Sequence, residues 1–147
     1  MKIRQLSLFL ENRPGQLRVP CKVLGDAGID ILTMSLADTQ QFGILRLIVR
    51  DWKHARDVLE AAGQVVNVTD LLALDVPDRA GGLASVLEVF EKTGLGVEYM
   101  YAFGLRERGK SATLLFRLED PDGAAVKLAA AGISLVSAEE LLRRANA

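Results

Sequence analysis

Asn12-Arg13-Pro14-Gly15-Gln16-Leu17 returns 66 residues later as Asp78-Arg79-Ala80-Gly81-Gly82-Leu83. The same offset takes Gly-Ile-Asp-Ile at 28–31 to Gly-Leu-Gly-Val at 94–97. Further along the chain the offset is 69, which takes Leu45 to Leu114. Internal similarity in a constant order indicates a duplicated structural unit.

The change of offset implies an insertion of three residues in the second copy. Its position falls around residues 106–110, Arg-Glu-Arg-Gly-Lys, a polar segment that contains glycine. Insertions are tolerated best in surface loops, so this segment is predicted to be a loop.

The first half of each copy predicts a strand followed by a helix. Residues 6–10 and 72–76 alternate apolar and other side chains, as half-buried strands do. Apolar residues then recur at helical spacing in 17–24 and 83–90, and a glycine, Gly28 or Gly94, follows each helix in the position of a left-handed cap. Pro20 lies inside the first of these helices, where its missing N–H is unfavourable, so that helix is expected to start late or bend.

The second half of each copy predicts two strands, a helix and a short strand. The strands are 31–37 and 44–49, repeated as 97–103 and 113–118. Asp51, or Asp120 with Pro121, starts a helix that Gly63 or Gly132 ends. Short strands at 65–66 and 133–136 close the units. The order is βαββαβ twice, which places both helices of a unit on one face of an antiparallel sheet.

The predicted fold is therefore α+β, with two ferredoxin-like units at residues 1–69 and 70–147. A short helix is expected at 138–144 within the second unit. The opposite face of the first sheet carries Phe9, Ile44 and Ile48 beside polar residues. An apolar patch of this kind favours an interface, so we expect a second sheet or another subunit to cover it.

Residues 12–17 and 78–83 join a strand end to a helix start, which favours anion binding. The first N–H groups of a helix have no internal partner, and the helix dipole attracts a carboxylate there. Glycine lets a ligand approach the backbone. A side-chain oxygen of Asn12 or Asp78 could accept from an ammonium group, which would complete a site for a zwitterion. The alternative is that Asn12 and Asp78 only cap helices, as these residue types commonly do.

At these residues the sequence resembles the ACT-domain family, in particular its amino-acid-binding tandem members. Segments 9–17, 27–31, 37–39, 42–49, 76–83 and 98–103 carry the resemblance, which spans nearly the whole chain. Ala80 stands where proline is usual in the family. The resemblance implies ferredoxin-like units that pair into an eight-stranded sheet and bind effector amino acids at their seam.

Carried onto this chain, the resemblance places each loop against the second strand of the other unit. Residues 12–17 would face 98–101, and residues 78–83 would face 30–34. The ligand-binding residues implied are Asn12, Arg13, Pro14, Gly15, Gln16, Leu17, Leu32, Met34, Asp78, Arg79, Gly81, Gly82, Leu83, Glu98, Tyr99 and Met100. Leu32, Met34 and Met100 favour a branched-chain or aromatic amino acid. Pro14 has no counterpart in the second loop, so the two sites are expected to differ in affinity.

The predicted function is a regulatory protein that binds a free amino acid, without a catalytic domain and without a cofactor. The alternative is a non-catalytic regulatory or interaction subunit of a separate enzyme of amino-acid metabolism. No nucleophile or acid–base constellation predicts catalysis. A homodimer in the cytoplasm is expected.

Composition supports these exclusions. The formal net charge of −1 and the scattered Lys and Arg residues argue against a nucleic-acid partner. No stretch approaches the roughly 20 apolar residues that span a bilayer, so no membrane role is expected. The only histidine, His54, is predicted to be solvated, and the only cysteine, Cys21, to be a buried filler. No metal site is expected, and Trp52 is predicted to cover the edge of the core.

Overall fold

The computed structural model describes residues 2–39, 41–107 and 110–145. The chain divides into two compact units, Arg4–Thr69 and Asp70–Ala147, and Met1–Ile3 belong with the second. The strands are β1 Ile3–Glu11, β2 Ile31–Thr39, β3 Phe42–Val49, β4 Val66–Pro77, β5 Val97–Glu107, β6 Ser111–Leu118 and β7 Leu135–Val136. The helices are α1 Arg18–Asp26, α2 Trp52–Ala61, α3 Gly82–Lys92, α4 Pro121–Ala130 and α5 Ala138–Ala145.

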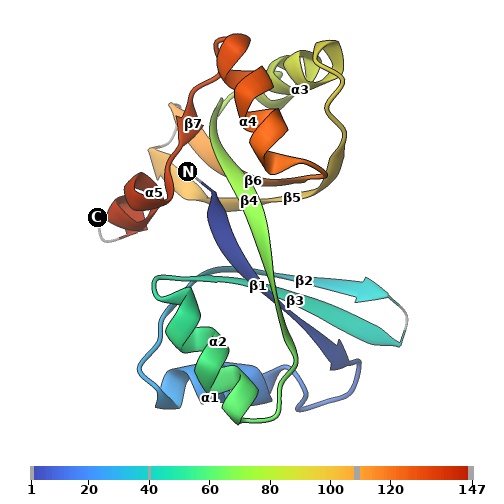
Figure 1. The fold of residues 1–147 in the computed structure, drawn as a ribbon, viewed down its shortest axis with the longest axis vertical. Helices are drawn as coiled ribbons and strands as arrows, with labels where there is room; N and C mark the ends of the chain where they lie inside the picture. Colours follow the sequence, from blue (N-terminus) through green and yellow to red (C-terminus); the bar gives the residue numbers. More distant parts are fainter. Residues whose placement is uncertain (1, 40, 108–109, 146–147) are drawn as a thin grey trace. The chain divides into compact units, whose positions relative to one another are not determined.

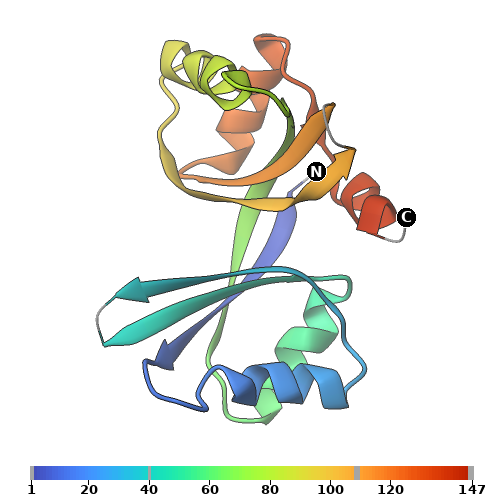
Figure 2. The same cartoon turned by 180° about the vertical axis from the view of Figure 1, so that it is seen from behind.

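The strand order in each unit is that of a ferredoxin-like fold. The N-terminal unit reads β2-β3-β1 followed by the first residues of β4, and the C-terminal unit reads β5-β6-β4-β7. The β1–β3 and β2–β3 pairings of the first unit are antiparallel, as are the β4–β6, β4–β7 and β5–β6 pairings of the second. Helices α1 and α2 cover one face of the first sheet, and α3 and α4 cover one face of the second (Figures 1 and 2). The predicted α+β duplication is confirmed.

The expected eight strands become seven among the described residues. The closing strand of the first unit and the opening strand of the second are one continuous strand, β4, of 12 residues. Residues 66–76 carry valine, leucine and threonine with no glycine or proline, so nothing in the sequence stops the strand between the units. The separate strand expected at 65–66 was therefore wrong.

Strand register follows the two sequence offsets. Leu8 pairs with Leu45 in the first unit, and Leu74 pairs with Leu114 in the second, as offsets of 66 and 69 require. The offset changes in the hairpin between β5 and β6, as predicted. Strand β5 has 11 residues where β2 has nine, and its pairing with β6 shifts register after Ala102. Arg108 and Gly109, inside the predicted insertion, lie outside the described residues.

Each unit has its own apolar core between sheet and helices. Leu6, Leu8 and Leu45 of the first core are completely buried. Leu74, Phe116 and Leu128 are completely buried in the second core. Each such side chain contributes about 1.5–3 kcal/mol through burial. Phe90 and Phe116 stack obliquely with ring centroids 5.1 Å apart. Separate cores mean that each unit positions its own loop.

Predicted helix ends are confirmed at α2 and α4. The side chain of Asp51 accepts from the N–H of His54 at 3.1 Å, and that of Asp120 accepts from the N–H of Gly123 at 3.1 Å. Helix α1 begins at Arg18, so Pro20 lies in its first turn, where an N–H would have no partner within the helix. The expectation of a late start is confirmed.

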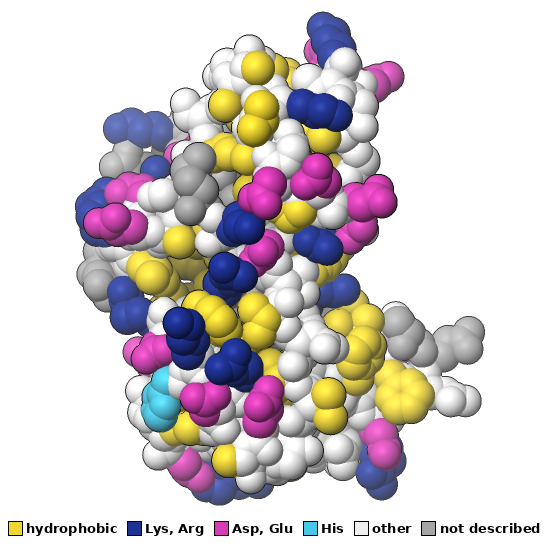
Figure 3. Space-filling view, viewed as in Figure 1, with side chains coloured by type: hydrophobic (Ala, Val, Ile, Leu, Met, Phe, Trp, Pro, Cys, Tyr) yellow, Lys and Arg dark blue, Asp and Glu magenta, His cyan; other side chains and the backbone are white. Residues whose placement is uncertain are grey.

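None of the described helices has the length and apolar character needed to cross a bilayer. The face shown in Figure 3 carries both basic and acidic side chains, and some basic side chains lie next to one another. In the N-terminal unit, Arg4, Lys53 and Arg56 all lie within 5.6 Å of the centre of the Trp52 ring.

Candidate functional site

The loop after β1 is held by three backbone hydrogen bonds. The N–H of Asn12 donates to the carbonyl of Gln41 at 3.0 Å, which ties the loop to the hairpin between β2 and β3. The N–H of Arg13 donates to Glu11 at 2.8 Å, and that of Gln16 donates to Arg13 at 3.2 Å. The loop therefore has a defined shape before helix α1 begins.

The loop after β4 repeats the same three bonds. The N–H of Asp78 donates to Lys110 at 3.3 Å, again in the following hairpin. The N–H of Arg79 donates to Pro77 at 3.0 Å, and that of Gly82 donates to Arg79 at 2.9 Å. All three N–H donors, and the acceptors Pro77 and Arg79, lie 66 residues after the corresponding residues of the first loop. The acceptor in the hairpin, Lys110, lies 69 residues after Gln41. Duplication thus extends from sequence to loop geometry.

Each loop contains one glycine with left-handed backbone geometry. Gly15 has φ of +89° and Gly81 has φ of +83°. Other residues rarely adopt this conformation, and a Cβ at either position would meet open space. The backbone is therefore exposed at both points, which is the access that a ligand carboxylate needs.

Neither helix start is capped by a side chain. The N-cap residues are Leu17 for α1 and Gly81 for α3, and neither makes a side-chain cap hydrogen bond. The alternative interpretation of Asn12 and Asp78 as helix caps is wrong, because both lie several residues before the helix. Helix N-termini without side-chain caps retain N–H groups that can bind an anion.

The structure places the loop side chains mostly at the surface. In the first loop, residues 12–15 and Leu17 are exposed and Gln16 is half-buried. The guanidinium of Arg13 pairs with the carboxylate of Glu11 at 2.6 Å. In the second loop, Arg79, Gly81 and Leu83 are exposed, Asp78 is half-buried and Gly82 is buried.

Gly82 has a structural role of its own. A Cβ there would lie 1.9 Å from the carbonyl oxygen of Pro77. Such a contact is impossible without a backbone shift, so the second loop needs glycine at this position to bring α3 against the end of β4.

The strand residues implied by the resemblance fall into different environments. Met34 is 41% exposed and Leu32 is half-buried. Met100 packs against the core of the C-terminal unit and Tyr99 is half-buried. The carboxylate of Glu98 pairs with Arg117 at 3.3 Å. Met100 therefore contributes to core packing. It does so because side chains alternate along β5 and because Met100 pairs with the buried Phe116.

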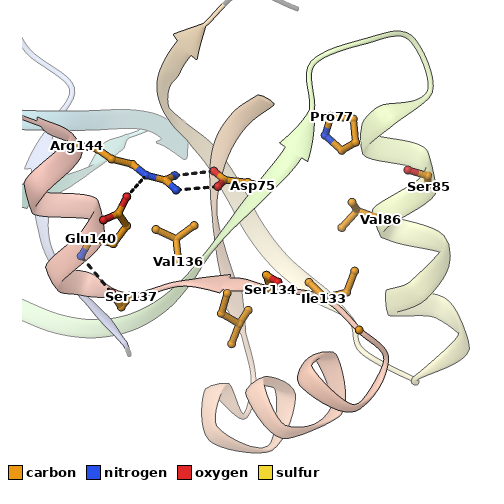
Figure 4. Close-up of a pocket in the computed structure, with 12 residues that line it drawn as sticks. Asp75, Pro77, Ser85, Val86, Ile133, Ser134, Val136, Ser137, Glu140 and Arg144 are labelled. Carbon is orange, nitrogen blue, oxygen red and sulfur yellow. Dashed lines mark hydrogen bonds and ion pairs between the residues drawn. The ribbon is translucent and has the colours of Figure 1, made fainter. Parts of the chain in front are cut away.

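A polar network that the sequence did not predict joins α5 to the second sheet. Arg144 donates to both carboxylate oxygens of Asp75, at 2.8 and 3.0 Å, and to the carboxylate of Glu140 at 2.8 Å (Figure 4). The hydroxyl of Thr113 donates to Asp75 at 2.8 Å, and Arg143 donates twice to Glu140. The available signal was Asp75, a charged residue among the otherwise apolar residues 71–76 of β4.

The network holds both carboxylates in their charged form. Burial opposes ionisation of Asp75, but hydrogen bonds from Arg144 and Thr113 outweigh it and lower the pKa. Hydrogen bonds from Arg143 and Arg144 lower the pKa of Glu140 from 4.5 to about 2. A bond to Asp75 raises the pKa of Arg144 further.

Outside the loops, the residues considered from the sequence, His54, Cys21 and Trp52, do not form a common site. His54 is exposed, as predicted, and Cys21 is half-buried, not fully buried, because Pro20 and Leu24 take the inner face of α1. Trp52 packs against the first core and lies 5.3 Å from the guanidinium of Arg56. The described residues contain no cluster of His, Cys, Asp and Glu that could hold a metal ion.

Several solved structures resemble this duplicated fold. Protein BT0572 from Bacteroides thetaiotaomicron is 33% identical, with a TM-score of 0.87 and 96% of each chain covered. The regulatory subunit of aspartate kinase from Thermus thermophilus, in its ligand-free form, is 14% identical, with a TM-score of 0.62, and 89% of this chain and 93% of that one are covered. The corresponding subunit from Thermus flavus has a TM-score of 0.60 at 14% identity, with 99% and 92% covered. No curated protein matches the chain significantly.

The two Thermus proteins share the fold with this chain at low sequence identity. The sequence profile described as "ACT domain pair" matches residues 1–145, nearly the entire chain. The chain belongs to the family of ACT domain pairs.

Proposed function

We propose that the protein is a non-catalytic regulatory module that binds a free amino acid at its two equivalent loops. The observation that carries the proposal is the repetition of three backbone hydrogen bonds and one left-handed glycine before helices without side-chain caps. Membership of the ACT family supports it.

The chemistry of the loops suits a zwitterion. The helix dipole and the backbone N–H groups at the start of α1 or α3 would attract the carboxylate, and the side-chain oxygen of Asn12 or Asp78 would accept from the ammonium group. Exposed Leu17 and Leu83 offer apolar contacts beside the loops, which favours a branched-chain or aromatic side chain.

Unequal affinities are expected for the two loops. Pro14 restricts the first loop, whereas Ala80 takes the corresponding place in the second. A less restricted loop loses more conformational entropy when a ligand orders it, so the first loop should bind more tightly.

A thermal-shift screen of the twenty amino acids tests the proposal. At a hundred times its dissociation constant, a ligand that binds only the folded state adds about 2.7 kcal/mol to the free energy of unfolding. We expect at least one amino acid to raise the Tm and the Gly15→Val variant to reduce that rise, because valine is strained at a φ of +89°.

The matched control is Gly25→Val. Gly25 lies in α1 with open space around a Cβ and no left-handed φ, so this variant should keep the ligand-dependent shift. No shift with any amino acid at millimolar concentration would contradict the proposal. An undiminished shift in Gly15→Val would show that the first loop is not the tighter site.

A second candidate is a subunit that acts through protein contacts alone. Large apolar side chains of the N-terminal unit are exposed, with Phe9 at 60%, Leu36 at 54% and Phe42 at 46%. Exposed apolar surface of this kind suits a second copy of the chain or an enzyme partner. This candidate, and not the first, predicts a stoichiometric partner together with no amino-acid shift. The molar mass measured by light scattering tests whether the chain forms the expected homodimer.

A further inference from the structure

Three cationic side chains of the N-terminal unit gather around the only tryptophan of the chain. Arg4 of β1 and Lys53 of α2 each lie 5.6 Å from the centre of the Trp52 ring. Arg56, one turn further along α2 than Trp52, lies 5.3 Å from the same point. We call these four residues the Trp52 cluster, and none of them belongs to the loop at residues 12–17.

The indole gives the cluster a fixed base. Trp52 is half-buried and packs against the apolar core of its unit. The electron-rich face of an indole attracts cations, which orders side chains that would otherwise move freely in water. Arg4 and Lys53 are exposed, and the side chain of Arg56 is 34% exposed. The cluster therefore presents positive charge to solvent on a rigid support.

The placement of these cations is unfavourable for α2 itself. Lys53 lies in the first turn of the helix, where the helix dipole favours acidic side chains, and residues 52–54 include none. Lys53 and Arg56 are three positions apart, so two like charges occupy neighbouring places on the helix surface. A bound anion would relieve both of these unfavourable interactions.

The second copy carries the opposite charge at equivalent positions. Arg4 corresponds to Asp70 at the offset of 66, and Lys53 corresponds to Asp122 at the offset of 69. Asp122 lies in the first turn of α4, and Lys2 pairs with its carboxylate at 3.3 Å. The fold of the unit therefore does not require positive charge at these positions, and the Trp52 cluster is a property of the first copy alone.

The charge of the cluster is only partly neutralised on α2. Within the described part of the chain, Lys53 forms no ion pair, and Asp57 is the carboxylate that pairs with Arg56. Both hydrogen bonds from Arg56, at 3.2 and 3.3 Å, go to one oxygen of Asp57, whose side chain is 66% exposed. Exposed pairs of this kind are weak, so a carboxylate from another molecule can compete for Arg56.

The cluster suits the carboxylates of a protein better than the phosphates of a nucleic acid. Single-stranded nucleic acids bind through rings on which bases stack, whereas Trp52 is the one ring of the cluster and already has three cations over it. Tryptophan and arginine are enriched among the residues that dominate binding energy at protein interfaces. A guanidinium also matches a carboxylate through two parallel hydrogen bonds.

We propose that the Trp52 cluster docks an acidic segment of a partner protein, with carboxylates of that segment bound to Lys53 and Arg56 and with Arg4 adding positive potential. Such a contact attaches a regulatory module to the protein on which it acts. The surface does not depend on the amino-acid proposal, because no residue of either loop takes part in it.

The fluorescence of Trp52, the only tryptophan, reports directly on this cluster. The probe is an acetylated and amidated hexaglutamate peptide, titrated into the full chain at low ionic strength. We expect a saturable change in fluorescence that weakens as salt is added, because salt screens exposed charges. A hexaglutamine peptide of the same length, which lacks the charge, should cause no change.

Variants of the same unit test the assignment. Lys53→Glu should weaken peptide binding about tenfold by placing like charges together. It should not unfold α2, because an acidic residue in the first turn is favourable. Lys22→Glu on α1 makes the same change in net charge outside the cluster and is the matched control. Asp57→Asn should tighten binding, because it removes the carboxylate that competes for Arg56.

The proposal would be overturned by no fluorescence change with hexaglutamate at millimolar concentration, or by an equal loss of binding in Lys22→Glu and Lys53→Glu. Tighter binding of tripolyphosphate or of a thymidine hexanucleotide than of the peptide would also overturn it, and would assign the cluster to phosphates. The rise in Tm with an amino acid is a separate readout. Lys53→Glu should keep that rise, and Gly15→Val should keep peptide binding, so failure of one proposal is distinguishable from failure of the other.

Discussion

At Gly82 and its neighbour Gly81 the second loop depends on two different properties of glycine. Gly81 supplies a left-handed φ of +83°, whereas Gly82 has no such φ but leaves no room for a Cβ beside the carbonyl of Pro77. The first loop needs only the left-handed residue, Gly15, because its helix starts later. The doubled glycine of the second copy is thus a packing requirement of α3.

Replacing Gly82 by alanine should destabilise the C-terminal unit by about 1–3 kcal/mol, as expected when a side chain is forced into a filled space. Gly96→Ala is the matched control, because a Cβ at Gly96 meets nothing within 4 Å and its φ is not left-handed. Urea unfolding of both variants measures the difference. Equal free energies of unfolding would show that the Pro77–Gly82 contact is not a constraint.

At the scale of elements, α5 is an addition to the ferredoxin-like unit and is held by few contacts. Leu141 is its one buried residue, at 1% exposure, and hydrogen bonds from Arg144 to Asp75 and Thr113 connect the helix to the second sheet. A helix of eight residues is not stable alone in water, so docking maintains it.

Acid should therefore release α5 before it unfolds the cores. The pKa of Glu140 is about 2 in the folded protein against 4.5 as its usual value, and the pKa of Asp75 is lowered too. As pH falls, the unfolded form binds protons first, so docking is stable above about pH 4.5 and weakens toward pH 2. Amide exchange of residues 138–145 between pH 6 and pH 2 measures this loss.

Substitutions of two neighbouring glutamates of α5, Glu140 and Glu139, provide the test and its control for the acid experiment. Glu140→Gln should flatten the pH dependence of α5 protection, and Glu139→Gln should leave it unchanged. Protection that persists to pH 2, or that is lost above pH 6, would contradict a role for these carboxylates.

Much of each element could be predicted, because alternation, helical spacing and capping residues are local signals. Asp51, Asp120 and the left-handed Gly28 and Gly94 act as predicted. Continuity of β4 also had a local signal, because residues 66–76 contain no glycine or proline, although the unit boundary expected at residue 69 placed a strand end there. The contacts of Asp75 had no local signal, because its partner Arg144 is 69 residues away in the sequence.

At the scale of the whole molecule, duplication preserves the loops and changes their surroundings. The register pair Phe9–Ile44 in the first unit corresponds to Asp75–Thr113 in the second. The first pair is apolar, with Phe9 exposed, and the second is polar and bonded to α5. The loops were predictable because they repeat in sequence, whereas the polar contacts of Asp75 were not, because the first copy has Phe9 at the corresponding position.

The backbone of the two equivalent loops is proposed to bind the carboxylate end of an amino acid. A titration of the ¹⁵N-labelled protein with the amino acid that raises the Tm most tests this binding mode at the level of single amides. We predict saturable amide shifts at Gly15 and the first turn of α1, and weaker ones at Gly81 and the first turn of α3. Binding that leaves the amides of both loops unshifted would rule out the loops as the site.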